Sequence, residues 1–214
     1  MSDLVLYIGN RRYSSWSVRP YLALAAAGAD FRAEVIILDQ PSTKTQIAAV
    51  NPAGHVPVLH HDGLVIHDSL AICEYVNELY PDAALWPRDR AERARARAVT
   101  SELHAGFTAL RRDLPQDLCS DKPGVGHTPE ALLDAVRVMQ IWRELRATAT
   151  TGPYLFGTYT IADAFFTPVA GRFKTYGVTL DHACQAYADA LLAFPPMASW
   201  IGSASLEAEL FDHP

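Results

Sequence analysis

Three serines and an arginine stand together near the start of the chain, in the segment Ser14-Ser15-Trp16-Ser17-Val18-Arg19. Hydroxyl residues favour the beginning of a helix, where free N–H groups and a partial positive charge attract an anion. Ser14 therefore has two possible uses, as an N-cap or as an active-site hydroxyl facing an anionic group. Capping is the commoner use of a serine in this position, so the motif by itself leaves both uses open.

Two further segments have residue types suited to binding a peptide-like ligand. In His55-Val56-Pro57, proline within an apolar strand removes a ladder donor and belongs at an edge or a special turn. A cis Val56–Pro57 bond would turn the N–H and C=O of Val56 outward, where they could pair with an extended peptide. In Asp68-Ser69, the carboxylate can hold an ammonium group and the serine can hold a carboxylate, which together match an amino-acid head group. Helix capping explains this second pair equally simply.

Two other patterns are structural in this interpretation. Thr160-Ile161-Ala162-Asp163 fits a capping box with aspartate at its last position. Four histidines lie close in sequence, but His60 and His61 are adjacent on a predicted strand and point to opposite faces. We therefore predict no metal site from the set His55, His60, His61 and His67.

The first eighty residues alternate between strand and helix signals. Apolar, β-rich runs predict strands, and an Asp62-Gly63 turn between two of them predicts a hairpin. Serine at one end and glycine at the other bound the first helix, and Asp68-Ser69 begins a later one. The order is β-α-β-(short α)-β-β-α, with strands at 4–8, 31–38, 56–60 and 64–66 and helices at 14–28 and 68–80. This order predicts a mixed sheet with helices packed on it.

From Pro87 onward the sequence contains helical patterns and no convincing strand. The predicted helices cover 88–118, 128–148, a segment from 160, 181–193 and 196–208. The fold class is therefore an α/β domain followed by an all-α domain. We expect an N-terminal domain at 1–80, a linker at 81–88 and an all-helical domain at 89–214.

Composition excludes several classes of protein. The chain has 214 residues, with 18 Lys+Arg against 24 Asp+Glu and a net charge of −6, which argues against nucleic acid or an anionic membrane as partner. The longest apolar run, Tyr21 to Ala29, is too short to span a bilayer. The three cysteines (Cys73, Cys119 and Cys184) have no metal-binding spacing, and the first residues lack a secretory signal pattern. We expect a reduced, cytoplasmic protein.

Taken in order, these motifs resemble the cytosolic glutathione transferases. Ser14 stands five positions before Arg19, as in the serine-type classes, and Pro57 matches the family's cis-proline. The motifs around Asp68-Ser69 are similar to the zeta and tau classes. The segment 101–111 and the Ser-Ser-Trp-Ser motif are similar to a set of bacterial transferases. The resemblance covers nearly the whole chain and implies a thioredoxin-like N-terminal domain (βαβ-ββα) followed by the all-helical domain.

The resemblance implies that glutathione is the co-substrate and that no metal takes part. Val56 would pair with the cysteinyl backbone, Asp68 and Ser69 would hold the γ-glutamyl head, and His55 would reach the glycyl carboxylate. The thiol would lie at Ser14, with Ser15 and Ser17 as rival contacts, of which Ser17 is expected to point into the first helical turn. Lowering the thiol pKa by about two units requires roughly 2.7 kcal/mol. One hydrogen bond to a charged group supplies about 1.5–3 kcal/mol, so a serine donor is sufficient.

The electrophile pocket is expected between the domains, lined by Trp16, His104, Phe107 and Arg111. The resemblance also implies a homodimer. The predicted function is glutathione conjugation to, or glutathione-dependent reduction of, a small hydrophobic electrophile. One alternative is isomerisation of an unsaturated acid of the maleylacetoacetate type, with Arg111 and Arg112 binding its carboxylate. Zeta-class isomerases, however, carry a cysteine where this sequence has Trp16. The other alternative is a non-catalytic scaffold or carrier.

Overall fold

The computed structural model describes residues 4–211, which begin with a four-stranded mixed sheet. Its order is β2-β1-β3-β4, formed by Leu4–Gly9 (β1), Phe31–Ile36 (β2), Val58–His61 (β3) and Leu64–Ile66 (β4). β1 runs parallel to β2, whereas β1–β3 and β3–β4 are antiparallel. β1 lies between two neighbours and is buried along nearly its whole length, which explains its continuous apolar sequence.

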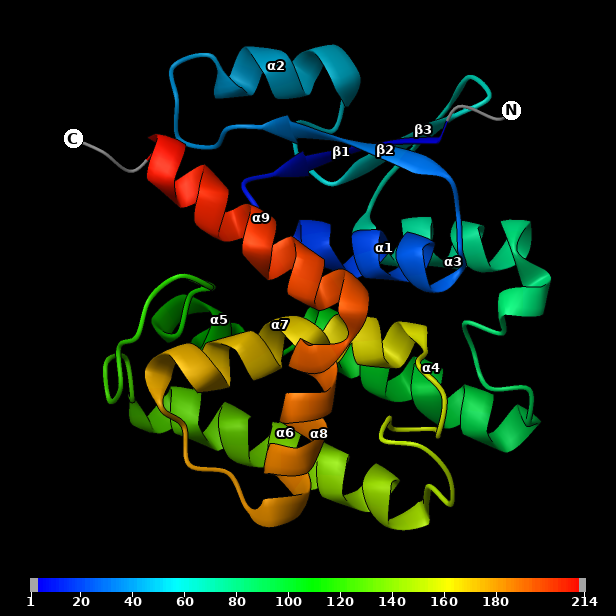
Figure 1. Ribbon diagram of the computed structural model, residues 1–214, viewed down its shortest axis with the longest axis vertical. Helices are drawn as coiled ribbons and strands as arrows, with labels where there is room; N and C mark the ends of the chain where they lie inside the picture. The colour runs from blue at the N-terminus through cyan, green and yellow to red at the C-terminus, as the bar shows by residue number, and fades with distance from the viewer. Residues whose placement is uncertain (1–3, 212–214) are drawn as a thin grey trace.

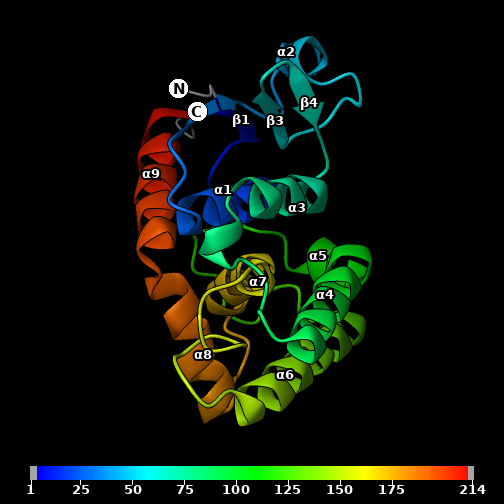
Figure 2. The same ribbon diagram turned by 90° about the vertical axis from the view of Figure 1, so that its right-hand side faces the viewer.

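Helices cover both faces of this sheet (Figure 1). Ser15–Ala26 (α1) and Ser69–Leu79 (α3) pack side by side on one face, and Thr43–Val50 (α2) lies on the other. The order of strands and helices is the one that the sequence predicts. α1 and α3 separate the sheet from the helical part of the chain, so their first turns lie where the two parts meet (Figure 2).

The remainder of the described chain is helical, as predicted. After a short 3₁₀ turn at Pro81–Ala83 (η1) come Arg90–Ala105 (α4), Thr108–Asp113 (α5), Pro129–Thr148 (α6), Ile161–Tyr176 (α7), His182–Ala193 (α8) and Pro195–Phe211 (α9). α7 runs through the middle and packs against α1, α4 and α8. The predicted capping box is present at its start: Thr160 and Asp163 bond each other's groups reciprocally. α9 returns alongside α1.

One predicted helix is wrong in its extent. The sequence predicts a continuous helix over 88–118, but α4 ends at Ala105 and α5 occupies only Thr108–Asp113. Phe107 adopts a left-handed conformation at the break, with φ of 55°. Arg111 stabilises the broken end, because its guanidinium donates to the carbonyls of Leu103, His104 and Gly106.

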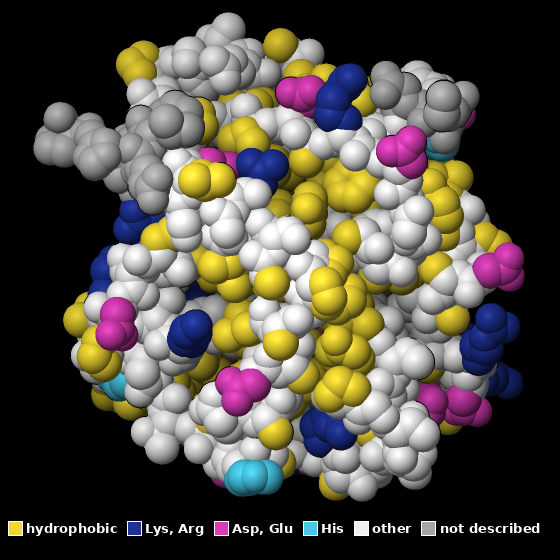
Figure 3. Space-filling view, in the orientation of Figure 1, with side chains coloured by type: hydrophobic (Ala, Val, Ile, Leu, Met, Phe, Trp, Pro, Cys, Tyr) yellow, Lys and Arg dark blue, Asp and Glu magenta, His cyan; other side chains and the backbone are white. Residues whose placement is uncertain are grey.

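Charged side chains are spread over the face crossed by α9 (Figure 3). Lys, Arg, Asp and Glu lie around a hydrophobic middle and do not gather into a patch of one sign on this side of the described chain. Within residues 4–211, no helix combines the length and apolar character that a membrane span requires.

Candidate active site

Two cavities adjoin at the start of α1. The larger, of about 570 Å³, contains Ser14 and Ser15, and the smaller, of about 290 Å³, contains Asp68 and Ser69. Both cavities are lined by Trp16, His55 and Val56. The three segments that the sequence singles out for binding or chemistry, at residues 14–16, 55–57 and 68–69, therefore meet around these two adjoining cavities.

Ser14 occupies the N-cap position of α1 without using its hydroxyl as a cap. Its Oγ lies 2.7 Å from Oγ of Ser17 instead. Ser14 is largely buried, with 7% of its surface exposed, yet it lines the larger cavity. The hydroxyl is thus turned away from the backbone donors of its own helix and is placed for a ligand in that cavity.

Ser15 has a different environment on the same cavity wall. Nη2 of Arg172 donates to its Oγ at 3.1 Å, and Nε of Arg172 donates to the carbonyl of Leu114 at 2.8 Å. Arg172 comes from α7 and is itself buried. Burial, and then the nearby charge of Arg111, lower the pKa of Arg172 to about 10. Arg172 is therefore still cationic at neutral pH, and it places a positive charge beside Ser15 on the wall of the cavity that Ser14 also lines.

The smaller cavity has an acid and a free hydroxyl at its wall. Asp68 caps α3 by accepting from the N–H groups of Leu70 and Ala71, and its other carboxylate oxygen lies 3.0 Å from Nε2 of His104. Burial opposes ionisation of Asp68, but these N–H groups and His104 outweigh it and lower its pKa. Oγ of Ser69 is buried and has no hydrogen-bond partner within the described chain. An unsatisfied buried hydroxyl costs about 1–3 kcal/mol, which a ligand bonded to it would recover.

Val56 and Pro57 stand just before β3, and the bond between them is cis. Asn51 holds this turn by donating from Nδ2 to the carbonyl of His55 at 2.6 Å. The His55 ring bonds the carbonyl of Ala53 and is exposed where the cavities meet. The main chain at Val56 therefore lies on the wall that the two cavities share.

Trp16 lines both cavities, and two arginine side chains contact its ring through cation–π interactions. The guanidinium carbon of Arg19 lies 4.0 Å from the centre of the Trp16 ring, and that of Arg111 lies 5.2 Å from it. His104 meets the same ring edge-on at 5.4 Å. Arg19 is buried, and its Nε and Nη1 have no hydrogen-bond partner within the described chain. Stacking on the aromatic face is the interaction that accommodates this charge.

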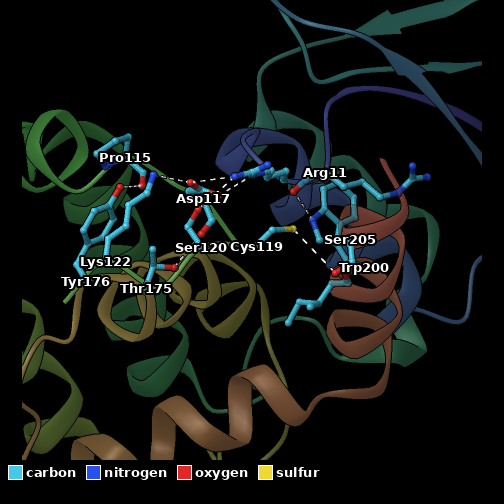
Figure 4. A network of polar contacts seen from close by, with 12 residues as sticks. Arg11, Pro115, Asp117, Cys119, Ser120, Lys122, Thr175, Tyr176, Trp200 and Ser205 are labelled. Carbon is cyan, nitrogen blue, oxygen red and sulfur yellow. Dashed lines mark hydrogen bonds and ion pairs between the residues drawn. The ribbon is translucent and has the colours of Figure 1, made fainter. Parts of the chain in front are cut away.

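The segment that leads into Ser14 is anchored by the C-terminal helix (Figure 4). Nε1 of Trp200 donates to the carbonyl of Arg11 at 2.9 Å. Arg11 in turn pairs with Glu207 through both its main-chain N–H and its guanidinium. Two residues almost two hundred positions away thus fix the loop that positions the Ser14 hydroxyl.

Asp117 anchors the same segment from the other side (Figure 4). Its carboxylate, only 6% exposed, accepts from Arg12 at 2.6 Å and from Lys122 at 2.7 Å. Burial opposes ionisation, but these two hydrogen bonds outweigh it and hold the pKa of Asp117 well below its usual range. Asp117→Asn is expected to lower the free energy of unfolding by about 1.5–3 kcal/mol at neutral pH.

The stability lost in Asp117→Asn should depend on pH, because the pKa of Asp117 is lowered in the folded protein. A lowered carboxyl pKa stabilises the fold above the unfolded value of about 3.9, and the stabilisation disappears as pH falls through the folded pKa. Urea unfolding should therefore show a constant difference between wild type and Asp117→Asn above about pH 5 and a shrinking one below pH 4. Asp121 is a nearby exposed aspartate, and Asp121→Asn serves as the control that should leave the free energy of unfolding nearly unchanged. A difference that is absent at pH 7, or that grows on acidification, would contradict this account.

Comparison with known proteins identifies the family. A family model for the glutathione S-transferase N-terminal domain matches residues 13–79. A probable maleylacetoacetate isomerase of Caenorhabditis elegans is 33% identical over 177 residues, which cover 79% of this chain and 80% of that protein. The chain belongs to the glutathione transferase family.

Two further similarities agree with this membership. Glutathione S-transferase 1 of Dianthus caryophyllus is 38% identical over 103 residues, about half of each chain. The structure of a glutathione transferase homologue from Burkholderia with bound glutathione superposes with a TM-score of 0.72 at 24% identity. That superposition covers 95% of this chain and 98% of the other, so the fold is shared over nearly the whole chain.

In this glutathione transferase, most of the candidate residues line the two cavities. His104 lies at the smaller cavity beside Asp68, and Arg111 lines the larger one while it caps α4. Phe107 lines neither cavity and is part of the core. Arg112, considered for a substrate carboxylate, is exposed and pairs with Asp113.

Two residues that line the larger cavity are not among the predicted contacts: Gln116 and Arg172. Gln116 is buried at the larger cavity, and neither end of its amide has a partner within the described chain. Neither Gln116 nor Arg172 belongs to a motif that marks it in the sequence as a binding residue. Their burial at the cavity is known only from the structure. Among the described side chains, those of residues 4–207, no three His, Cys, Asp or Glu are grouped so that they could hold a metal ion.

Proposed function

We propose that this protein binds glutathione across both cavities and activates its thiol for conjugation to, or reduction of, a small hydrophobic electrophile. One observation carries the proposal: the Ser14 hydroxyl, unused as a cap, faces a cavity that adjoins the one containing Asp68 and the unpartnered Ser69. A thiol donor site and an amino-acid site are thus placed side by side. The glutathione bound to the Burkholderia homologue supports the choice of ligand.

Each part of the tripeptide has a matching group. The Asp68 carboxylate attracts the ammonium of the γ-glutamyl unit, and the Ser69 hydroxyl at the start of α3 bonds its carboxylate. The main-chain N–H and C=O of Val56 pair with the cysteinyl unit as a neighbouring strand would. His55, exposed at the junction, reaches toward the glycyl carboxylate.

The chemistry needs a stabilised thiolate. A free thiol has a pKa of about 8.5, so it is mostly protonated at neutral pH. Three groups at the larger cavity favour the thiolate: the Ser14 hydroxyl as donor, the positive end of α1, and the charge of Arg172 behind Ser15. The serine donates a hydrogen bond and is not a base, because its own proton is held far too tightly. The thiol proton leaves to solvent, and the thiolate forms a C–S bond with the electrophile. A halide leaves with its bonding pair, or, at an activated double bond, the π electrons move to the acceptor and take up a proton from solvent.

The ligand's linkage offers a direct test. Calorimetric titration should show binding of glutathione at one site per chain. The isomer with an α-linked glutamate has the same atoms but places its ammonium and carboxylate differently. We expect it to bind at least about tenfold more weakly, a difference of about 1.4 kcal/mol. Equal affinity would remove Asp68 and Ser69 from the account, and no binding of either peptide would reject the proposal.

The lining of the larger cavity favours a second candidate, glutathione-dependent isomerisation of an unsaturated acid. Arg111 and Arg172 supply positive charge there, and Gln116 supplies an unpartnered amide. These groups suit a carboxylate or carbonyl oxygen. The C. elegans relative bears an isomerase name. Incubation with glutathione and a cis-unsaturated keto acid separates the candidates: an isomerase releases the trans acid and consumes no glutathione, whereas a conjugating enzyme consumes one per turnover.

We also propose that the protein is a homodimer. Apolar side chains remain exposed on α6 and β4, including Leu133 at 70%, Val136 at 53% and Leu64 at 51%. A second copy of the chain that packed against these two elements would remove their apolar surface from water. Light scattering should give the mass of two chains, and the mass of one chain would reject the dimer.

A further inference from the structure

The third serine of the motif, Ser17, is fully buried and lines neither cavity. Its side chain is therefore out of reach of a ligand in either cavity. Its Oγ nevertheless has two polar neighbours. The N–H of Gly9, at the end of β1, lies 3.1 Å away, and Oγ of Ser14 lies 2.7 Å away.

The direction of these hydrogen bonds follows from counting protons. The Gly9 N–H can only donate, so Ser17 Oγ accepts from it. Ser17 then has one proton and Ser14 has one proton, and either hydroxyl can donate to the other. If Ser14 donates to Ser17, its proton is unavailable to the cavity. If Ser17 donates to Ser14, the Ser14 proton is free to point outward.

A thiolate in the larger cavity selects the second arrangement, because it can only accept. We propose that Ser17 is a positioning residue that holds the Ser14 hydroxyl as a donor toward the glutathione thiolate. The chain of donors runs from the Gly9 N–H through Ser17 and Ser14 to sulfur. Each bond in such a chain polarises the next, so Ser14 becomes a better donor than an isolated serine.

Ser15 provides the internal contrast. Ser15 lines the larger cavity as Ser14 does, but it receives its hydrogen bond from Arg172, whereas the hydrogen bonds of Ser17 are with Gly9 and Ser14. The inference about Ser17 rests on the proposed function, since it acts only when a thiolate is bound at Ser14.

The test is the pKa of the thiol of bound glutathione, followed by thiolate absorbance. Ser17→Ala should raise this pKa by about half a unit to one unit, because one hydrogen bond supporting the donor is lost. Glutathione affinity below pH 6, where the thiol is neutral, should change less than about twofold. Ser17→Cys, of similar size but a weak donor, should shift the pKa in the same direction if the alanine variant folds poorly. Ser205→Ala on α9 is the control and should leave the pKa unchanged.

A double variant separates positioning from a merely structural role. Because Ser17 acts through Ser14, Ser14→Ala/Ser17→Ala should have the same thiol pKa as Ser14→Ala alone. A shift that persists in the Ser14→Ala background, or a Ser17→Ala pKa equal to that of wild type, would overturn the inference and leave the proposed function standing. A bound thiol with an ordinary pKa in wild type would instead overturn the proposed function and this inference with it.

Discussion

Asp68→Asn is expected to weaken glutathione binding by about 10- to 100-fold. Asp68 is ionised because its pKa is lowered, and it faces the cavity where the γ-glutamyl ammonium is proposed to bind. A hydrogen bond to a charged group contributes about 1.5–3 kcal/mol, which gives this range of affinity. Asparagine still caps a helix well, so the change removes charge while α3 keeps its N-cap. Calorimetric titration measures the effect.

Two controls make the result specific. Asp181→Asn alters the N-cap of α8, where Asp181 accepts from the N–H of Cys184, and should leave glutathione binding unchanged. Glutathione that lacks its amino group has no ammonium for Asp68 to bind. It should therefore bind to wild type and to Asp68→Asn with similar affinity. If Asp68→Asn bound intact glutathione as tightly as wild type, the head-group assignment would be wrong.

Ser14→Ala is expected to slow turnover strongly near neutral pH and only slightly at high pH. If the wild-type thiol pKa is lowered by about two units, about half of the bound thiol is ionised at pH 6.5. Without the donor, the thiol pKa returns most of the way to its free value and the ionised fraction falls to a few per cent, so the rate of conjugation with an aryl halide should drop roughly 10- to 50-fold. At pH 9 the thiol is mostly ionised in both forms, and the two rates should converge. A pH profile of kcat/KM measures this.

The dependence of kcat/KM on pH distinguishes a lost hydrogen-bond donor from general damage to the site. A loss that is equal at every pH would indicate damage to the site and not a lost donor.

Ser15→Ala decides between the two serines that the sequence leaves open. With the thiol at Ser14, Ser15→Ala should cost less than about fivefold at pH 6.5, or about 1 kcal/mol. A larger and pH-dependent loss in Ser15→Ala than in Ser14→Ala would reassign the donor.

Local chemistry made much of the fold predictable. The order of strands and helices in the first eighty residues follows from apolar runs, the Asp62-Gly63 turn and the capping residues. The capping box at Thr160 and Asp163 is also a local pattern, and it is present. These features depend on residues a few positions apart, so periodicity and spacing contain the information.

Side-chain directions and contacts between distant residues could not be predicted. The helix expected over 88–118 breaks at Gly106 and Phe107, where the Arg111 guanidinium bonds the carbonyls at the end of α4, and apolar periodicity does not reveal such a break. Ser14 is an N-cap by position, but only the structure shows that its hydroxyl turns to Ser17. Arg172 reaches Ser15 from 157 positions away. Propensity and spacing give no information on such a contact.

The central claim is that this protein lowers the pKa of the glutathione thiol through the Ser14 hydroxyl. The most direct test is the ultraviolet absorbance of the thiolate of bound glutathione, followed against pH in wild type and Ser14→Ala. The account predicts a wild-type thiol pKa about two units below the free value of about 8.5, returning most of the way toward it in the variant. A bound thiol that titrates near its free value in wild type, or at the same lowered value in both proteins, would contradict the claim.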